Sequence, residues 1–155
     1  MASQKHLDLL SSGKTLWNAW RREYSDVQAF EPDLHGADLH GADLSGIDLH
    51  GVDFTEANLR GANLQEADLH EADLRNADLR SADLSDSNLL KARLRWADLR
   101  SARLCRSNLR EADFTNADLR GTDMDGAILL KAIFDEAKMS NGAETIDENV
   151  QARAI

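Results

Sequence analysis

Residues 66–84 read EADLHEADLRNADLRSADL, which is a five-residue unit, A-(D/N)-(L/F)-x-x, repeated without interruption. The unit extends in both directions from this stretch, with no insertion or deletion, over residues 32–141. Its large apolar residue, here called the centre, recurs every five residues from Leu34 to Met139 and gives 22 units. The centre is Leu in 17 units, and the residue two positions before it is Ala in 16. The repeat therefore explains why Leu, Ala and Asp supply 64 of the 155 residues.

A period of five fits neither a helix, which repeats every 3.6 residues, nor a long strand, which alternates every two. Within a unit, however, the small and the large apolar residue lie two apart, as inward-facing neighbours on a strand do. The remaining two residues must turn the chain. Seven of the nine glycines stand two residues after a centre, where a type II turn requires a positive φ. Each unit is therefore predicted to be a short extended side followed by a corner.

Runs such as GADLHGADLS (36–45) and TNADLRG (115–121) closely resemble the pentapeptide repeat family, and the resemblance covers about 70% of the chain. It implies a mainly β fold, the right-handed quadrilateral β-helix, with four units per coil and the small residue and the centre pointing inward. The spacing of the phenylalanines supports a 20-residue coil, because Phe54, Phe114 and Phe134 then share one column. Twenty-two units make about 5.5 coils, which are about 26 Å long at the usual strand spacing.

The predicted interior is full, because each coil contributes four large centres and mostly four alanines. We therefore expect no cofactor and no internal substrate cavity, and we place any activity on the outer columns or at the ends. The sequence has no Gly-rich phosphate loop, zinc-ligand cluster or nucleophile elbow, which indicates a protein that is not an enzyme. Of the remaining alternatives, a metal or enzymatic site at His50 and His70 is the weakest. Cys105 has no identifiable general base and is interpreted as an inert thiol.

The chain divides into three predicted parts: an N-terminal helical cap (1–31), the β-helix (32–141) and a C-terminal tail or capping helix (142–155). Residues 6–10 indicate a short helix that ends near Gly13, and residues 15–24 a second helix. Leu16, Trp17, Trp20 and Tyr24 lie at helical spacing, and we expect this apolar stripe to cover the core of the first coil.

The residues before the repeat also read L-x-x-G-x-x-x-W-N-x-W-R. This pattern resembles the leaders that precede pentapeptide repeats in cyanobacterial proteins, and it is carried by Leu10, Gly13, Trp17, Asn18, Trp20 and Arg21.

At the C-terminal end the repeat decays and leaves apolar residues on the outside, namely Ile128, Leu130 and Ile133. Exposed apolar side chains of this kind need cover. Two covers remain open: the chain's own tail, or a second subunit. The second is implied by the resemblance, because some family members dimerise end to end through their C-terminal coils.

Acidic residues outnumber basic ones 28 to 18, and the formal net charge of -10 argues against direct binding to nucleic acid. The first thirty residues contain no apolar run long enough for a signal peptide, and the apolar stretch 127–134 is too short to span a bilayer. The single cysteine excludes an intramolecular disulfide framework. These features predict a cytoplasmic protein that does not associate with a membrane.

The charge is unevenly distributed. Residues 31–90 carry a net charge of -11, whereas residues 91–110 carry +6. We call the second segment, with its exposed aromatic residue, the basic belt; its members are Arg93, Arg95, Trp96, Arg100, Arg103, Arg106 and Arg110. Arg and Trp are enriched at the energetic centres of protein interfaces.

The leading hypothesis is a non-catalytic protein–protein interaction module that binds an unidentified protein partner through the belt. Alternatively, the belt arginines only pair with Asp columns in neighbouring coils. The main functional alternative comes from the family resemblance: some relatives mimic DNA, so the acidic coils would make the chain a ligand of a type II topoisomerase such as DNA gyrase.

Overall fold

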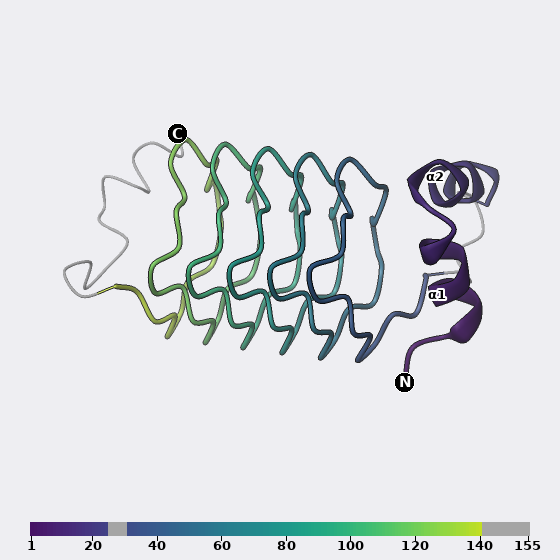
Figure 1. Ribbon diagram of the computed structural model, residues 1–155. Coiled ribbons are helices and arrows are strands. Elements are labelled where there is room, and N and C mark those ends of the chain that lie inside the picture. The colour runs from purple at the N-terminus through teal and green to yellow at the C-terminus, as the bar shows by residue number, and fades with distance from the viewer. Residues whose placement is uncertain (25–30, 141–155) are drawn as a thin grey trace.

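The computed structural model describes residues 1–24 and 31–140. In the described repeat region, eighteen parallel bridges join residues that are 20 positions apart, from Asp33 with Asp53 to Asp118 with Lys138. Four units therefore form one coil, as the spacing of the phenylalanines predicts. Figure 1 shows the coils stacked along one axis, with the two helices at the N-terminal end. The fold is the right-handed quadrilateral β-helix.

The backbone hydrogen bonds explain why this unit repeats so regularly. In a typical unit all five N–H groups have an acceptor: three bond to neighbouring coils, one closes the turn, and one bonds to the Asp or Asn side chain two residues earlier. The unit 57–61 shows the set, with Ala57 to Phe54 O (2.9 Å), Asn58 to Ala37 O (2.9 Å), Leu59 to Asp78 O (2.8 Å), Arg60 to Asn58 Oδ1 (3.3 Å) and Gly61 to Arg80 O (2.9 Å). No donor within such a unit is left without a partner.

The Asp or Asn before the centre is thus a structural residue. It stands in 17 units, and in all 17 its Oδ1 accepts the N–H of the second residue that follows. This is the local bond by which Asp and Asn favour turns. The acidic columns on the outside are therefore a consequence of how the corner is built.

The corners adopt the predicted positive φ, between 56° and 72°. Glycine nevertheless occupies only seven of them; the described part of the chain has 14 other residues in the same left-handed conformation, Glu71 and Lys91 among them. That conformation costs an L-residue about 1–2 kcal/mol. The stacked core offsets this strain, so glycine is favoured at the corners without being required there.

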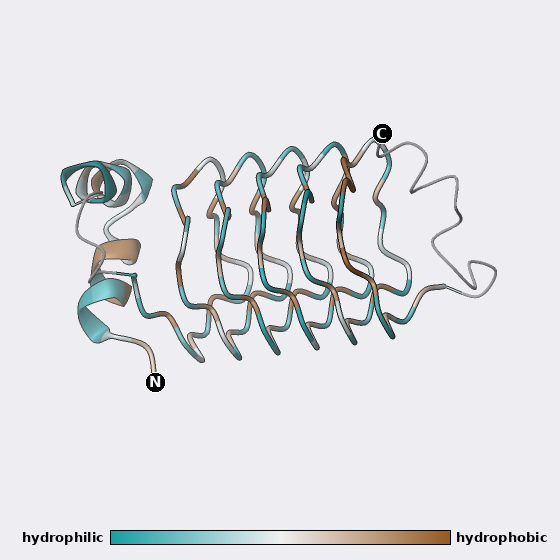
Figure 2. Cartoon of the chain, turned by 180° about the vertical axis from the view of Figure 1, so that it is seen from behind, coloured by the Kyte–Doolittle hydropathy of each residue, from teal (hydrophilic) through white to brown (hydrophobic). Residues whose placement is uncertain are grey.

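The interior is filled as predicted. The centres from Leu44 to Leu119 are at most 4% exposed, and Phe114 stacks on Phe134 with ring centroids 5.0 Å apart. Figure 2 shows apolar residues recurring along the coils. In the last described coil Met124 and Leu129 are only partly buried, because no described residue stacks on them. The predicted tail or capping helix at 142–155 lies outside the described residues.

Two helices, α1 (Gln4–Ser11) and α2 (Lys14–Glu23), precede the first coil, close to the positions that the sequence predicts. Helix α2 contacts the exposed strand edge of that coil with polar side chains. Trp17 Nε1 donates to the carbonyl of Asp48 (2.6 Å), Asn18 Oδ1 accepts the N–H of Asp48 (2.9 Å), and Arg21 Nη2 donates to the carbonyl of His50 (2.6 Å). These contacts pair backbone groups that would otherwise be open to further strands.

The predicted apolar stripe on α2 is only partly right. Trp17 is fully buried and Trp20 partly so, whereas Leu16 and Tyr24 are exposed. The reason is that the buried face of α2 meets a polar backbone edge and follows Trp17 and Arg21, which lie one helical turn apart. In the described residues, neither helix has the length and apolarity to cross a membrane.

Candidate interaction surface

The β-helix has four sides, which we number by their first centres: Leu34 on side 1, Leu39 on side 2, Leu44 on side 3 and Leu49 on side 4. The basic belt runs around one coil, so its members are spread over all four. Side 1 carries Arg93 and Arg95, the corner to side 2 carries Trp96, side 2 carries Arg100, side 3 and its corner carry Arg103 and Arg106, and side 4 carries Arg110. A partner that approaches one edge therefore cannot contact the whole belt.

Most belt arginines form ion pairs with Asp residues. Arg93 Nη1 lies 3.5 Å from Asp73 Oδ2 and Arg103 Nη1 lies 3.3 Å from Asp83 Oδ2, both in the preceding coil. Arg106 pairs with Asp86 in the same way, Arg95 with Asp113 in the following coil, and Arg100 with Asp98 in its own unit. The side chain of Arg110 has no such partner within residues 1–24 and 31–140. Pairing with neighbouring columns is thus a real feature of the belt.

Ion pairing leaves the arginines on the outside. Arg93 is 63% exposed while its partner Asp73 is 13% exposed, and Arg103 is 59% exposed while Asp83 is 22% exposed. The carboxylates are recessed because each is also held by backbone at its corner. An incoming molecule therefore meets guanidinium groups first.

Arg93 and Arg103 have lost a structural bond. They replace the Asp that accepts the N–H two residues later, and in the described part of the chain no side chain accepts the N–H of Arg95 or Cys105. Ion pairs between exposed side chains are worth little. The two substitutions are therefore poorly explained by stability alone.

Trp96 is the aromatic residue among the corners. Its φ is 58°, the residue is 53% exposed, and the guanidinium carbon of Arg95 lies 5.5 Å from its ring centroid. Asn76 and Asn116 occupy the same corner one coil before and one coil after. Asn tolerates the left-handed conformation well, whereas a bulky residue there is an outlier. Neither backbone conformation nor burial accounts for an indole at this corner.

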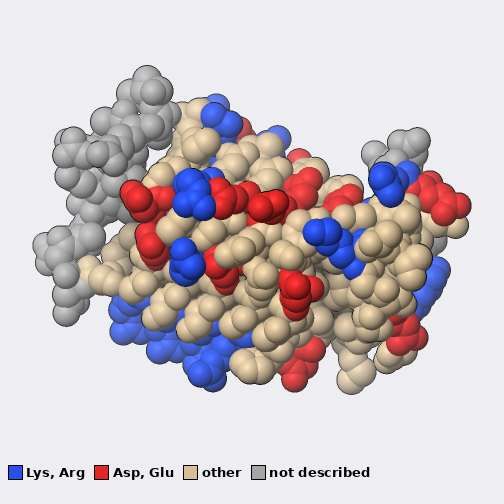
Figure 3. All heavy atoms as spheres, turned by 45° about the horizontal axis from the view of Figure 1, so that its top comes forward, with Lys and Arg blue, Asp and Glu red and all other residues tan. Residues whose placement is uncertain are grey.

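Side 2 carries a column of arginines at 20-residue spacing: Arg60, Arg80, Arg100 and Arg120. Arg80, Arg100 and Arg120 each bind the Asp two residues earlier, at 2.5–2.6 Å, and two of them also lie within 4 Å of the next Asp along the column. These hydrogen bonds lower the pKa of the aspartates involved, which are Asp78, Asp98 and Asp118. Arg60 follows Asn58 instead of an Asp and forms no ion pair with a described residue. Figure 3 shows basic side chains gathered towards the C-terminal end, with acidic ones beside them.

The coils differ in how their acidic groups are balanced. Residues 31–70, which we call the acidic coils, contain nine acidic residues and one basic residue. Residues 71–130, which we call the paired coils, contain eleven acidic and ten basic residues. The acidity of the whole chain is therefore concentrated in its first two coils.

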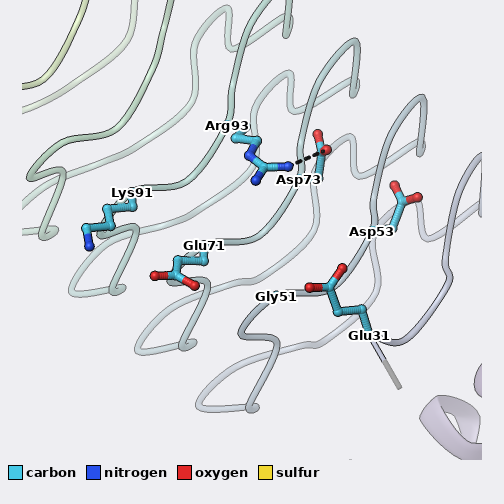
Figure 4. A pocket seen from close by; sticks show the side chains of 7 residues that line it. All are labelled: Glu31, Gly51, Asp53, Glu71, Asp73, Lys91 and Arg93. Atoms are coloured by element: carbon cyan, nitrogen blue, oxygen red, sulfur yellow. Dashed lines mark ion pairs between the residues drawn. The ribbon is translucent and has the colours of Figure 1, made fainter. Parts of the chain in front are cut away.

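A groove of about 500 Å³ follows the corner between sides 4 and 1, from the acidic coils to the belt. Figure 4 shows the carboxylates of two adjacent columns along it, with Lys91 and Arg93 at one end. Burial opposes the ionisation of Asp73, but hydrogen bonds from Arg75 outweigh it and lower the pKa of that carboxyl. The full lining is Glu31, Gly51, Asp53, Glu71, Asp73, Lys91 and Arg93.

The histidine pair is a stack held by aspartates. The rings of His50 and His70 lie 4.8 Å apart with an interplanar angle of 6°, and each Nδ1 contacts the Asp two residues earlier, at 2.5 Å and 2.8 Å. Lone pairs on parallel rings are themselves parallel, so they do not converge on one ion. In the described residues, no three His, Cys, Asp or Glu side chains form a group that could hold a metal.

Cys105 is buried, and its Sγ lies 4.0 Å from the carbonyl oxygen of Asp123. Hydrogen bonding to Asp123 and burial raise the pKa of the thiol, and they outweigh the opposite effect of Arg103. A thiol with a raised pKa is a poor nucleophile at neutral pH. This agrees with its interpretation as inert.

The apolar residues at the C-terminal end are exposed as the sequence predicts. Ile128 and Leu130 lie on side 4 of the last described coil, and Ile133 follows on side 1. Nothing in the described chain covers them.

Comparison with known proteins adds a sequence family and solved relatives. The family described as "Pentapeptide repeats" matches in overlapping segments, at residues 33–70, 53–89, 67–106, 92–130 and 107–141. No curated protein sequence matches the chain.

Among solved structures, the chain is similar to Rfr23, a pentapeptide repeat protein of the cyanobacterium Cyanothece 51142, with 28% identity, a TM-score of 0.69 and coverage of 80% of this chain and 94% of that one. It is also similar to a pentapeptide repeat protein from the thylakoid lumen of Arabidopsis thaliana, with 33% identity, a TM-score of 0.53 and coverage of 69% and 71%. QnrB1, a plasmid-mediated fluoroquinolone resistance protein, matches at 18% identity and a TM-score of 0.39, over 83% of this chain and 92% of that one.

Proposed function

Because the chain belongs to the pentapeptide repeat family, we propose that it is a non-catalytic protein–protein interaction module that binds its partner through the basic belt on the outside of the β-helix. The full interior supports a role for the outer surface, since the centres leave no space for a substrate. We also propose a cytoplasmic location, because a single buried cysteine requires no oxidising compartment.

The observation that carries the proposal is the replacement of Asp by Arg93 and Arg103. At these two positions the chain forgoes the side-chain bond that the 17 Asp and Asn units keep, and it gains only an ion pair made by each exposed arginine. Recognition of a partner explains this loss, since exposed arginines are, with Trp, a residue type that anchors interfaces.

A second candidate function rests on the acidic coils. Their net charge of -8 is spread over two coils, about 10 Å along the axis. Duplex DNA has about six phosphates in the same length. This density of negative charge favours a DNA-mimicking ligand of a type II topoisomerase such as gyrase, although the near-neutral paired coils interrupt the run of negative charge along the axis.

The C-terminal end supports one further contact. Ile128, Leu130 and Ile133 would be covered if two copies paired end to end, which makes a homodimer a proposed additional state.

One experiment separates the two functions. The native chain is immobilised beside an Arg93→Asp/Arg103→Asp variant, which restores the structural Asp, and beside a control, Arg60→Asp/Arg120→Asp, with the same change in charge outside the belt. Each is exposed to cell extract and, separately, to purified gyrase. We expect partner proteins to be captured by the native chain and the control and lost from the belt variant. Gyrase binding that is unchanged or tighter in the belt variant, with no partner lost, overturns the belt and supports the second function.

A further inference from the structure

One edge of the molecule combines the two features of the belt that stability does not explain. These are an Arg in place of the structural Asp and an exposed indole at a corner. The edge comprises the outward residues of sides 1 and 2 on either side of their shared corner in the coil 91–110, and we call it the Trp96 edge; it consists of Arg93 and Arg95 on side 1, Trp96 at the corner and Arg100 on side 2. Arg103 and Arg106 belong to side 3 and its corner, and Arg110 belongs to side 4. A single partner segment can therefore contact the Trp96 edge without contacting the rest of the belt.

The unit 92–96 departs from the repeat twice. It lacks the Asp that accepts the N–H of Arg95, and it places an indole at a corner where the adjacent coils have Asn. Trp96 is 53% exposed, and the guanidinium of Arg95 lies over its ring, 5.5 Å from the centroid, in a cation–π contact. The result is an exposed apolar surface at a corner of the coil.

The arginines around the indole are available for further bonds. Arg93 is more exposed than its partner Asp73 (63% against 13%), and the same holds for Arg95 with Asp113 (45% against 26%) and Arg100 with Asp98 (44% against 30%). Within the described residues, Arg93 reaches a carboxylate through Nη1 and Arg95 through Nε. Each planar guanidinium has five N–H donors, so both retain free donors with the geometry that fits a second carboxylate.

We propose, building on the proposed function, that the Trp96 edge docks an acidic segment of a protein partner, with one large apolar side chain covering the indole and flanking carboxylates binding Arg93, Arg95 and Arg100. Charge complementarity selects an acidic segment, because the outer layer of this edge consists of guanidinium groups over recessed carboxylates. The acidic coils repel an acidic segment, but the repulsion is limited to about 8 Å by physiological salt. The indole selects for an apolar residue, since burying an exposed ring is the largest gain that this edge offers.

The test uses a displayed library of random peptides, selected on the full native chain and counter-selected on Trp96→Asn. Asn occupies the same corner in the neighbouring coils, so the substitution removes the indole and keeps the backbone conformation; circular dichroism and the thermal transition verify the fold. We expect the retained peptides to carry Asp or Glu on both sides of one large apolar residue. Retained peptides that are basic, or no peptide that distinguishes the two chains, overturn the proposal.

The best retained peptide is then synthesised with a fluorescent label, and its binding is measured by anisotropy. We expect Trp96→Asn and Arg93→Gln/Arg100→Gln each to weaken binding about tenfold or more. The matched control, Arg103→Gln/Arg110→Gln, removes two belt arginines from other sides and leaves affinity unchanged. Equal weakening by the control, or a labelled single-stranded DNA that binds the edge more tightly than the peptide, overturns the proposal.

The two proposals fail in different ways. If partner capture depends on Arg93 and Arg103 but no acidic peptide depends on Trp96, the docking mode is wrong and the interaction function stands. If the belt variant captures the same partners as the native chain, the interaction function itself is wrong.

Discussion

The acidic coils (31–70) and the paired coils (71–130) have the same kind of interior but differ in surface charge, which is strongly negative in the first and near neutral in the second. In both, residues 20 apart bridge in parallel, and the large centres are buried except for Leu39, Met124 and Leu129 near the two ends. The difference lies mainly in the residue after the centre. In the acidic coils it is usually His, Ser, Thr or Gln, whereas in the paired coils it is most often Arg, and each such Arg except Arg110 pairs with a carboxylate.

This comparison separates architecture from recognition. The aspartates support the corners equally in both regions, so acidity alone carries little information about function. What varies is whether an arginine neutralises the aspartate, and whether the aspartate is present at all. The informative positions are therefore those where the structural residue is missing. Within these two regions they are Arg93, Arg103 and Ile128, and only Arg93 and Arg103 replace it with a charged residue.

The largest expected effect tests whether the two interiors are equivalent. Phe54→Ala and Phe114→Ala each remove a fully buried ring from side 1, one in each region. We expect each to lower the free energy of unfolding by about 3–5 kcal/mol, because the rigid stack cannot close the cavity. Urea denaturation followed by circular dichroism measures both.

The surface control is Thr55→Ser, which keeps the hydroxyl that bonds to Asp53. A single transition with similar losses for both alanine variants indicates one cooperative unit. A loss confined to one variant would mean that the coils unfold separately and that the interiors are not equivalent.

An intermediate effect concerns the cap, which contacts only the acidic coils. Trp17→Phe keeps an aromatic ring in place but leaves the carbonyl of Asp48 without its donor. We expect a loss of about 1–3 kcal/mol, the usual cost of stranding a buried acceptor. Amide hydrogen exchange should accelerate in residues 31–50 before it does so in residues 91–110. Leu16→Ala, at the adjacent exposed position, should leave stability and hydrogen exchange unchanged. Acceleration spread evenly along the β-helix would contradict a local role for the cap.

Much of the fold is predictable from sequence because one period governs it. The five-residue spacing gives the turn, the 20-residue coil and the inward residues, and the recurrence of Phe54 and Phe114 in one column fits the observed bridges. The structural role of Asp was missed, although its exchange with Asn carried the signal: both side chains offer the oxygen that the turn requires.

The cap and the candidate site were less predictable. Apolar spacing finds helix α2 but predicts its buried face only in part, because the contacts of Asn18 and Arg21 with a strand edge follow no hydrophobic pattern. Charge locates the belt, and the coil period places its members on four sides. The recessed position of Asp73 beneath Arg93 depends on side-chain conformation, which no repeat pattern encodes.

The smallest effect concerns the ion pairs of the paired coils. The triple variant Asp78→Asn/Asp98→Asn/Asp118→Asn replaces three carboxylates with amides. Each amide oxygen can still accept the corner N–H, as that of Asn58 does, but the negative charge that binds arginine is lost. The pairs are exposed, so we expect Tm at neutral pH to fall by no more than about 2 °C. The matched triple Asp33→Asn/Asp38→Asn/Asp53→Asn reduces the negative charge of the acidic coils, and there we expect Tm to stay level or rise.

The pH dependence of the free energy of unfolding tests the same ion pairs in a second way. Hydrogen bonds from arginine hold the pKa of Asp78, Asp98 and Asp118 in the folded chain below the ordinary value of 3.8. The unfolded chain therefore binds protons first as the pH falls, so the stabilisation is complete above about pH 4 and is lost as the pH drops through the folded values. Urea denaturation between pH 6 and about pH 3 should show a shallower acid loss for the paired-coil triple than for the native chain. An identical acid loss in both would mean that these pairs do not contribute to stability, and that the arginines of the paired coils, like those of the belt, must be explained by what they bind.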